Sequence, residues 1–123
     1  MRELSHPKAP EKVKGWIANC PAWLVVHSVA PNPDSTLANL GNGEREAIIL
    51  AELLGATLIM DERDGRVEAG RRKLPLTGLV GALLDSSEHG LADLEQALAR
   101  LQQTTFHLSP RLVSRLLKRR RCK

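Results

Sequence analysis

One stretch near the middle of the chain, residues 41–66, restricts the fold most, because two buried elements follow each other there with a single glycine between them. Its sequence is GNGEREAIILAELLGATLIMDERDGR. The part from Glu44 to Leu54 is apolar on almost every side, which predicts a helix covered on most of its faces. Asn42 is expected to cap this helix, and Gly55 to end it, since glycine adopts the left-handed conformation without steric cost.

The residues after this helix predict a strand. Ala56 to Met60 is an uninterrupted apolar run without alternation, which is typical of a strand buried on both faces in a parallel sheet. The charged run DERDGR follows it at once. Ligands of open α/β sheets bind beyond the carboxyl ends of the strands, so Asp61 stands where a functional site is expected.

Acidic side chains near the two ends of this unit are candidate metal ligands. A helix and the strand that follows it run antiparallel, so the start of the helix and the end of the strand can lie at one edge of the sheet. Glu46 and Asp61 are therefore expected to face a common crevice, where carboxylates would suit Mg²⁺ or Mn²⁺. The alternative is that Glu44 and Glu46 are first-turn acids favoured by the helix dipole and that DERDGR is a solvated turn.

The flanking segments predict a small α/β domain with a partly parallel sheet and a helical C-terminal half. Further strands are expected at residues 22–29 and 74–77, and residues 30–40 are expected to be a loop. Apolar periodicity and start signals predict the further helices, which are expected at residues 11–19, 65–73, 78–87, 91–101 and from Pro110 onward, with Ser109 as the cap of the last.

Composition limits what the domain can do. A chain of 123 residues is expected to form a single domain, with residues 118–123 as a basic tail. The aromatic residues are Trp16, Trp23 and Phe106, too few for a platform on which nucleic-acid bases stack. There is no apolar run of membrane-spanning length and no signal core at the N-terminus, so we expect a cytoplasmic protein that does not enter a membrane.

The net charge of +4 is unevenly distributed. Two groups of cations are candidates for contact with phosphates. The first comprises Arg66, Arg71, Arg72 and Lys73. The second lies near the C-terminus and comprises Arg111, Arg115, Lys118, Arg119, Arg120, Arg121 and Lys123. For the second group the alternative is structural, because a helix dipole favours cations in its last turn and charged tails are usually solvated.

Three segments of the chain, in this order, resemble the PIN-like nucleases related to VapC-type toxins. They are GEREAIILAELLGATLIMDERDGR, LPLTGLVGALLDSSEHGL and FHLSPRLVSRLLKR. The likeness is narrower to an uncharacterised bacterial branch of that superfamily, which carries a GE-x-EAI helix, a DER-x-GR turn and a TG-x-x-G segment. The initial REL and the WIANCPAWLVV stretch fit that branch as well. The resemblance covers nearly the whole chain, although no single motif is specific.

This resemblance implies a metal-dependent ribonuclease, in which acids at one end of a parallel sheet hold Mg²⁺ or Mn²⁺ and the metal activates water against a phosphodiester. By position, Glu46 and Asp61 match the catalytic acids of the family. The metal ligands that the resemblance implies are these two acids together with Glu3, and with Glu44 and Asp64 as alternatives. Contacts with the scissile phosphate are implied for Arg63 or Arg66.

The start of the chain departs from the family pattern. PIN-like domains usually open with a strand that ends in the first metal-binding Asp, whereas this sequence begins directly with the REL-like segment that contains Glu3. We therefore expect a PIN-like domain truncated at its N-terminus that lacks its first strand, with weak metal binding and impaired cleavage. Unpaired strand edges invite pairing with another chain, so we also expect a homo-oligomer.

Two functions of different classes follow from these observations. The first is a PIN-like ribonuclease of the toxin type, intact or impaired, acting on RNA. The second is a non-catalytic α/β interaction protein that self-associates, or that binds an antitoxin-like partner or nucleic acid through its basic clusters. An in-frame start further upstream, encoding an apolar strand that ends in Asp, would favour the first.

Overall fold

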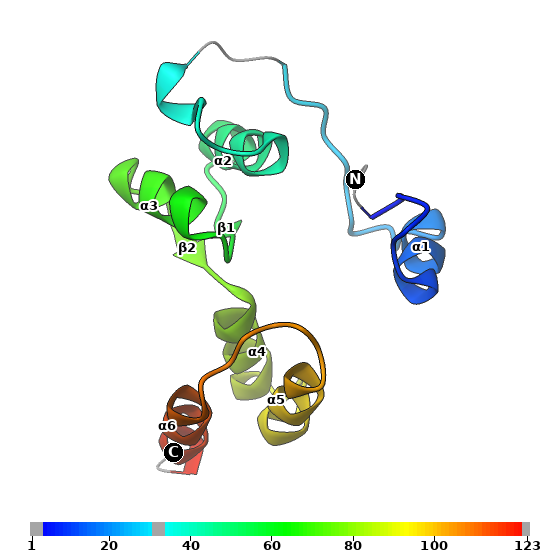
Figure 1. The fold of residues 1–123 in the computed structure, drawn as a ribbon, viewed down its shortest axis with the longest axis vertical. Helices are drawn as coiled ribbons and strands as arrows, with labels where there is room; N and C mark the ends of the chain where they lie inside the picture. The colour runs from blue at the N-terminus through cyan, green and yellow to red at the C-terminus, as the bar shows by residue number, and fades with distance from the viewer. Residues whose placement is uncertain (1–3, 31–33, 122–123) are drawn as a thin grey trace. The chain divides into compact units, whose positions relative to one another are not determined.

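A computed structural model describes residues 4–30 and 34–121, with the backbone alone for residues 119–121 (Figure 1). The chain divides into two compact units, Met1–Pro33 and Asp34–Lys123. None of the helices in the described ranges combines the length and the apolar character needed to cross a membrane.

The first unit contains one helix, α1 (Glu11–Ala18), among its described residues, which confirms the predicted amphipathic segment. The rings of Trp16 and Trp23 lie with their centroids 6.1 Å apart. The strand predicted for residues 22–29 is wrong: the segment forms no strand, and Val25 and Val26 are 64% and 59% exposed. A strand needs a hydrogen-bonded neighbour, and the described part of this unit offers none, so β-branched composition alone does not form one here.

The second unit begins with an α/β region, residues 34–78, in which a parallel pair of short strands is joined through a helix. Leu58 lies opposite Leu76 and Ile59 opposite Thr77 in this pair. The predicted class, a small α/β domain with a parallel sheet, is confirmed. The elements of this region are a 3₁₀ turn η1 (Ser35–Leu37), α2 (Asn42–Leu54), β1 (Leu58–Ile59), α3 (Arg63–Arg71) and β2 (Leu76–Thr77).

A helical region, residues 79–121, completes the second unit and confirms the predicted helical C-terminal half. It consists of α4 (Leu79–Glu88), α5 (Leu94–Gln102) and α6 (Pro110–Arg121). Gly90 takes a positive φ of 72° after α4. The Ser109 hydroxyl accepts the backbone N–H of Leu112 at 3.1 Å, as the predicted cap requires. Leu91 is 81% exposed and precedes α5, so it is not part of the predicted apolar stripe.

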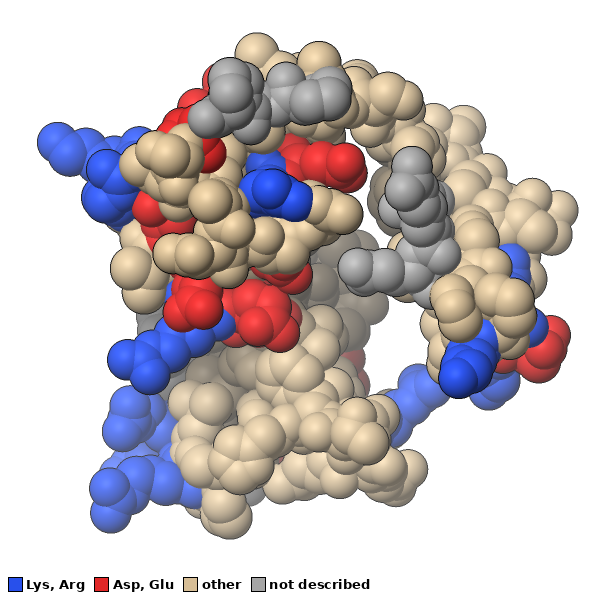
Figure 2. All heavy atoms as spheres, turned by 45° about the horizontal axis from the view of Figure 1, so that its top comes forward, with Lys and Arg blue, Asp and Glu red and all other residues tan. Residues whose placement is uncertain are grey.

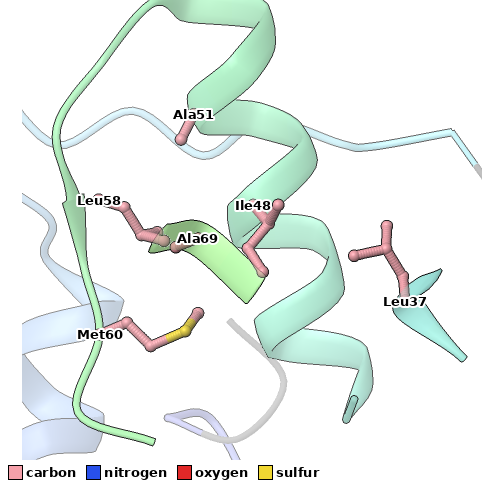
Figure 3. Close-up of a cluster of buried hydrophobic side chains, with 6 residues drawn as sticks. All are labelled: Leu37, Ile48, Ala51, Leu58, Met60 and Ala69. Carbon is pink, nitrogen blue, oxygen red and sulfur yellow. The ribbon is translucent and has the colours of Figure 1, made fainter. Parts of the chain in front are cut away.

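Each region of the second unit has its own apolar core. The core of the α/β region is formed by buried side chains from η1, α2, β1, the residue after β1, and α3. Figure 3 labels these side chains: Leu37, Ile48, Ala51, Leu58, Met60 and Ala69. In the helical region the buried residues are all leucines, contributed by α5, α6 and the segment before α6: Leu94, Leu98, Leu108 and Leu116.

Three details of the central stretch differ from prediction. The prediction that the helix is covered on most of its faces is wrong, because Leu53 and Leu54 are 74% and 56% exposed and the buried residues of α2 are Ile48 and Ala51. Asn42 is the first residue of α2 rather than its cap, and Gly41 takes the cap position, whereas Gly55 ends the helix at a φ of 61° as predicted. The strand is buried on one face only, because Leu58 and Met60 are buried while Ile59 between them is 63% exposed. The parallel pair has α2 and α3 packed against the face of Leu58.

Candidate active site

Asp61 lies just beyond the end of β1, where its carboxylate meets the start of α4. Each of its two carboxylate oxygens lies 3.2 Å from the backbone nitrogen of Leu79, which donates to them. The positive end of the α4 dipole favours a negative charge at this point. Asp61 therefore holds α4 against the end of β1, a structural role that stands beside its proposed chemistry.

Gly78, directly after β2, lets these groups come together. A β-carbon at Gly78 would lie 2.6 Å from Oδ1 of Asp61 and 3.1 Å from Nη1 of Arg66. The same Nη1 of Arg66 donates to the carbonyl oxygen of Met60 at 2.8 Å. The carboxylate of Asp61 and the guanidinium of Arg66 thus converge where the two strands end, which is the edge at which α/β folds bind ligands.

A second group of acids lines a pocket of about 170 Å³ between the starts of α2 and α3. The carboxylate of Glu44 folds back over Gly41, where any β-carbon would clash with it. The positive ends of the two helices favour this gathering of negative charge. The residues that line the pocket are Asn39, Leu40, Gly41, Glu44, Glu62, Asp64 and Gly65.

The predicted ligands are therefore divided between different places. Glu44 and Asp64 share the pocket, together with Glu62, which the sequence analysis did not select. Glu46 is exposed on α2, and its placement in one crevice with Asp61 stays a prediction. Glu3 lies outside the described residues. The signal for Glu62 was its position between two predicted ligands at a strand end.

The carboxylate oxygens that line the pocket are of the chemical type that a hard divalent cation prefers, since Mg²⁺ and Mn²⁺ bind oxygen ligands. Among residues 4–30 and 34–121, no three Asp, Glu, His or Cys side chains lie close enough together to hold a metal directly. Metal binding by the pocket acids therefore stays a prediction, and it would require an ion that keeps most of its own water, as Mg²⁺ commonly does in proteins.

Arg72 joins three elements of the α/β region through its guanidinium group, which the sequence analysis assigned to phosphate contact. Its nitrogens donate to Glu68 of α3 at 2.8 Å and to Glu52 of α2 at 2.6 Å. Nη2 donates to Asp34 and to the hydroxyl of Thr36, both at 2.7 Å. The sequence signal for part of this network was the spacing of four residues between Glu68 and Arg72 on one helical face.

The network changes the acidity of its members. Hydrogen bonds from the Thr36 hydroxyl and from Arg72 lower the pKa of Asp34 to about 2. Hydrogen bonds from Arg71 and Arg72 lower the pKa of Glu68, a buried carboxylate, to about 2. The carboxylates in turn raise the pKa of Arg72, so the group is a set of fixed charges at neutral pH.

Of the four arginines predicted to contact phosphate, two are held by carboxylates of the chain itself. Arg72 is engaged as described above, and Arg71 donates to Glu68 at 2.6 Å and 3.0 Å. Arg63 opens α3 with an exposed side chain, and Arg66 lies beside Asp61. Phosphate contact stays a prediction for all four, and the geometry favours Arg63 and Arg66.

A parallel strand pair with an acid and an arginine gathered at its carboxyl end places a candidate site where α/β domains bind ligands. A family model described as a PIN domain matches residues 1–121 of this chain. The match covers nearly the full length, so the chain belongs to the PIN domain family, and the resemblance to PIN-like nucleases is confirmed at that level. No curated protein and no solved structure gives a significant match.

Proposed function

We propose that this PIN domain is a ribonuclease of the toxin type that depends on Mg²⁺ or Mn²⁺ and cleaves phosphodiester bonds at the carboxyl end of β1. The observation that carries the proposal is the acidic pocket at the starts of α2 and α3, close in sequence to the acids that the family resemblance selects. Membership of a nuclease superfamily supports the reaction class.

The proposed roles follow from position. Glu44 and Asp64 hold the hydrated ion in the pocket, and Glu46 and Asp61 are the catalytic acids that the family resemblance assigns. Once bound, such an ion activates water and neutralises charge on the scissile phosphate. Arg66, whose guanidinium lies beside Asp61 at the strand ends, orients a phosphate oxygen by charge-assisted hydrogen bonding.

Cleavage by this chain is expected to be weak. Asp61 already accepts the N–H of Leu79 with both oxygens, so its lone pairs are shared between the helix and any ligand. A metal held mainly through water is poorly aligned, and metal catalysis depends on that alignment. The impaired activity proposed here therefore rests on how the described acids are arranged.

The test is cleavage of single-stranded RNA in the presence of Mn²⁺ by the wild-type chain and two double variants. One variant removes the pocket acids, Glu44→Gln with Asp64→Asn, and the other removes the acids of the resemblance, Glu46→Gln with Asp61→Asn. Slow cleavage that both variants abolish is the expected result. The matched control is Glu95→Gln with Glu11→Gln, two exposed acids outside the α/β region, which should cleave as the wild type does. Cleavage that persists in both double variants would overturn the proposal.

A second candidate function, a protein-interaction domain, is favoured by exposed apolar side chains in the α/β region. Leu53, Leu54, Ile59 and Val67 are each more than half exposed, and both strands of the two-stranded sheet have an unpaired edge within the described residues. Such surface suits self-association or an antitoxin-like protein that adds a strand. Light scattering on wild type and Ile59→Thr tests it: a homo-oligomer that the substitution dissociates is expected, and a wild-type monomer at high concentration would contradict self-association.

A further inference from the structure

The last part of the chain carries positive charge without any acid. Eight Lys or Arg residues and no Asp or Glu lie between Gln96 and Lys123, so all 14 acids precede this segment. The rest of the chain, residues 1–95, is acidic overall. The net charge of +4 for the whole chain therefore hides a strongly positive C-terminal segment. A local excess of one sign of charge creates an electrostatic surface that attracts ligands of the opposite sign.

Helix α6 presents part of this charge as an ordered row. Arg111, Arg115 and Lys118 are exposed and follow each other at spacings of four and three residues, which places them on one face of the helix. At a rise of about 1.5 Å per residue, they follow each other along the axis at intervals of about 6 Å and about 4.5 Å. Blue side chains project into solvent over α6 at the lower left of Figure 2.

The three cations have no acidic partner among the described residues, in contrast to those of the α/β region. Arg71 and Arg72 form ion pairs with Glu68, Glu52 and Asp34. The row on α6 has no such ion pair within residues 4–30 and 34–121, so its guanidinium and ammonium groups are available to a ligand. We define Arg111, Arg115 and Lys118 as the cationic row.

The opposite face of α6 is fully used in packing. Leu116 is buried in the leucine core, and Leu112, Val113 and Leu117 pack against that core. A helix that lies in a membrane surface needs a free apolar face to insert among lipids, and α6 has none to offer. The cationic row therefore suits a soluble polyanion rather than a lipid surface.

We propose that the cationic row is the docking surface for the phosphodiester backbone of single-stranded RNA, which it binds without regard to base sequence. The proposal rests on the proposed ribonuclease function, since it supplies the substrate to the same domain. Sequence independence follows from the lack of stacking partners in the second unit, where the aromatic residue Phe106 packs against the leucine core.

The size of the effect follows from counterion release. For single strands the logarithm of the binding constant falls with the logarithm of salt concentration with a slope of about −0.7 for each phosphate neutralised. The three cations of the row should therefore contribute about −2 to this slope. Their loss should weaken binding at low salt at least tenfold.

The experiment is fluorescence anisotropy with a labelled oligouridylate in EDTA, which prevents metal-dependent cleavage and so separates docking from catalysis. The variant Arg111→Gln, Arg115→Gln, Lys118→Gln is compared with Lys8→Gln, Lys12→Gln, Lys14→Gln, which removes the same charge from three lysines of the first unit that have no proposed part in phosphate binding. Glutamine has nearly the helix propensity of arginine and lysine, so α6 should remain folded, and circular dichroism checks this.

The row variant should bind at least tenfold more weakly at low salt, and the slope of its salt dependence should be shallower by about 2. The lysine variant should change little in either quantity. Oligoadenylate and single-stranded DNA of the same length should bind like oligouridylate. The proposal is overturned if the row variant binds as tightly as the lysine variant, or if the wild-type chain sediments with anionic phospholipid vesicles and does not bind RNA. A chain that binds in this way but does not cleave would contradict the ribonuclease proposal alone.

Discussion

The α/β region and the helical region of the second unit are held together in different ways. The α/β region has a small mixed core and uses the ion pairs of Arg72 to connect η1, α2 and α3. The helical region has a core of leucines, and the cations of α6 are left outside it. The comparison indicates that Arg72 and its carboxylate partners serve structure in the α/β region, whereas the cations of α6 are free to serve binding.

The largest effect is expected in the leucine core. Leu98→Ala removes a side chain that is 1% exposed and should cost about 2–5 kcal/mol of the free energy of unfolding, through lost burial and a cavity. Leu91→Ala, the same change at an exposed position before α5, is the matched control and should cost less than about 0.5 kcal/mol. Urea denaturation measures both. Equal costs would show that the leucine core does not hold the helical region together.

A smaller but substantial loss is expected when the charged connection of the α/β region is broken. Arg72→Gln leaves Asp34, Glu52 and Glu68 without their shared partner and should cost about 1–3 kcal/mol. The side chain of Arg72 is 15% exposed, so solvent screens the loss only in part. Arg71→Gln is the control on the same helix, where a 58% exposed side chain is screened by solvent and should contribute much less. If the two variants are equally stable, Arg72 does not connect these elements energetically.

The same network predicts how stability depends on pH. The pKa values of Asp34 and Glu68 are lowered to about 2 in the folded chain, from ordinary values of 3.8 and 4.5. Below the ordinary values the unfolded chain binds more protons, so this stabilisation is complete above about pH 4.5 and is lost as the pH falls towards 2. Urea denaturation of wild type and Arg72→Gln between these pH values should show a shallower decline in the variant. Parallel declines would contradict the assignment.

The smallest effect concerns the link between the two regions. Asp61→Ala removes the carboxylate that accepts the N–H of Leu79 and should cost about 1 kcal/mol, the usual contribution of a helix cap. Asp61→Asn keeps one acceptor oxygen and should cost less, although it removes the charge. Thermal unfolding of both separates the structural role of Asp61 from its proposed chemistry. A larger loss in Asp61→Asn than in Asp61→Ala would exclude the capping role.

Helices and their ends could be predicted from the sequence where local signals, such as caps and apolar periodicity, agree with the packing. The helix α2, its stop at Gly55 and the Ser109 cap of α6 each have a local cause, and each was confirmed. The predicted covering of α2 on most of its faces was wrong, because apolar composition does not determine which side chains find a neighbour. The burial of Leu37 was not accessible, because its segment looked like a loop and became part of the core only through long-range contacts. The failed strand at residues 22–29 has the opposite cause: its composition is right, but a partner is missing among the described residues of its unit.

The site was accessible only in part. The sequence placed acids near the start of α2 and the end of β1, and the structure gathers Glu44 and Asp64 there with Glu62. It could not show that Arg72 is held by three carboxylates, since Asp34 and Glu52 lie 38 and 20 residues away in sequence. Pairs within one helix turn can be read from spacing, whereas distant pairs depend on the tertiary fold.

The acids of the α/β region are thus proposed to bind the metal, and the cations of α6 to bind the backbone of the RNA. The most direct test is a Mn²⁺ titration followed by electron paramagnetic resonance. Wild type and the row variant of α6 should bind one Mn²⁺ with the same, roughly millimolar, dissociation constant, as expected for few and flexible carboxylates. The variant Glu44→Gln with Asp64→Asn should lose this binding. Unchanged Mn²⁺ affinity in the pocket variant would contradict the assignment of metal binding to these acids.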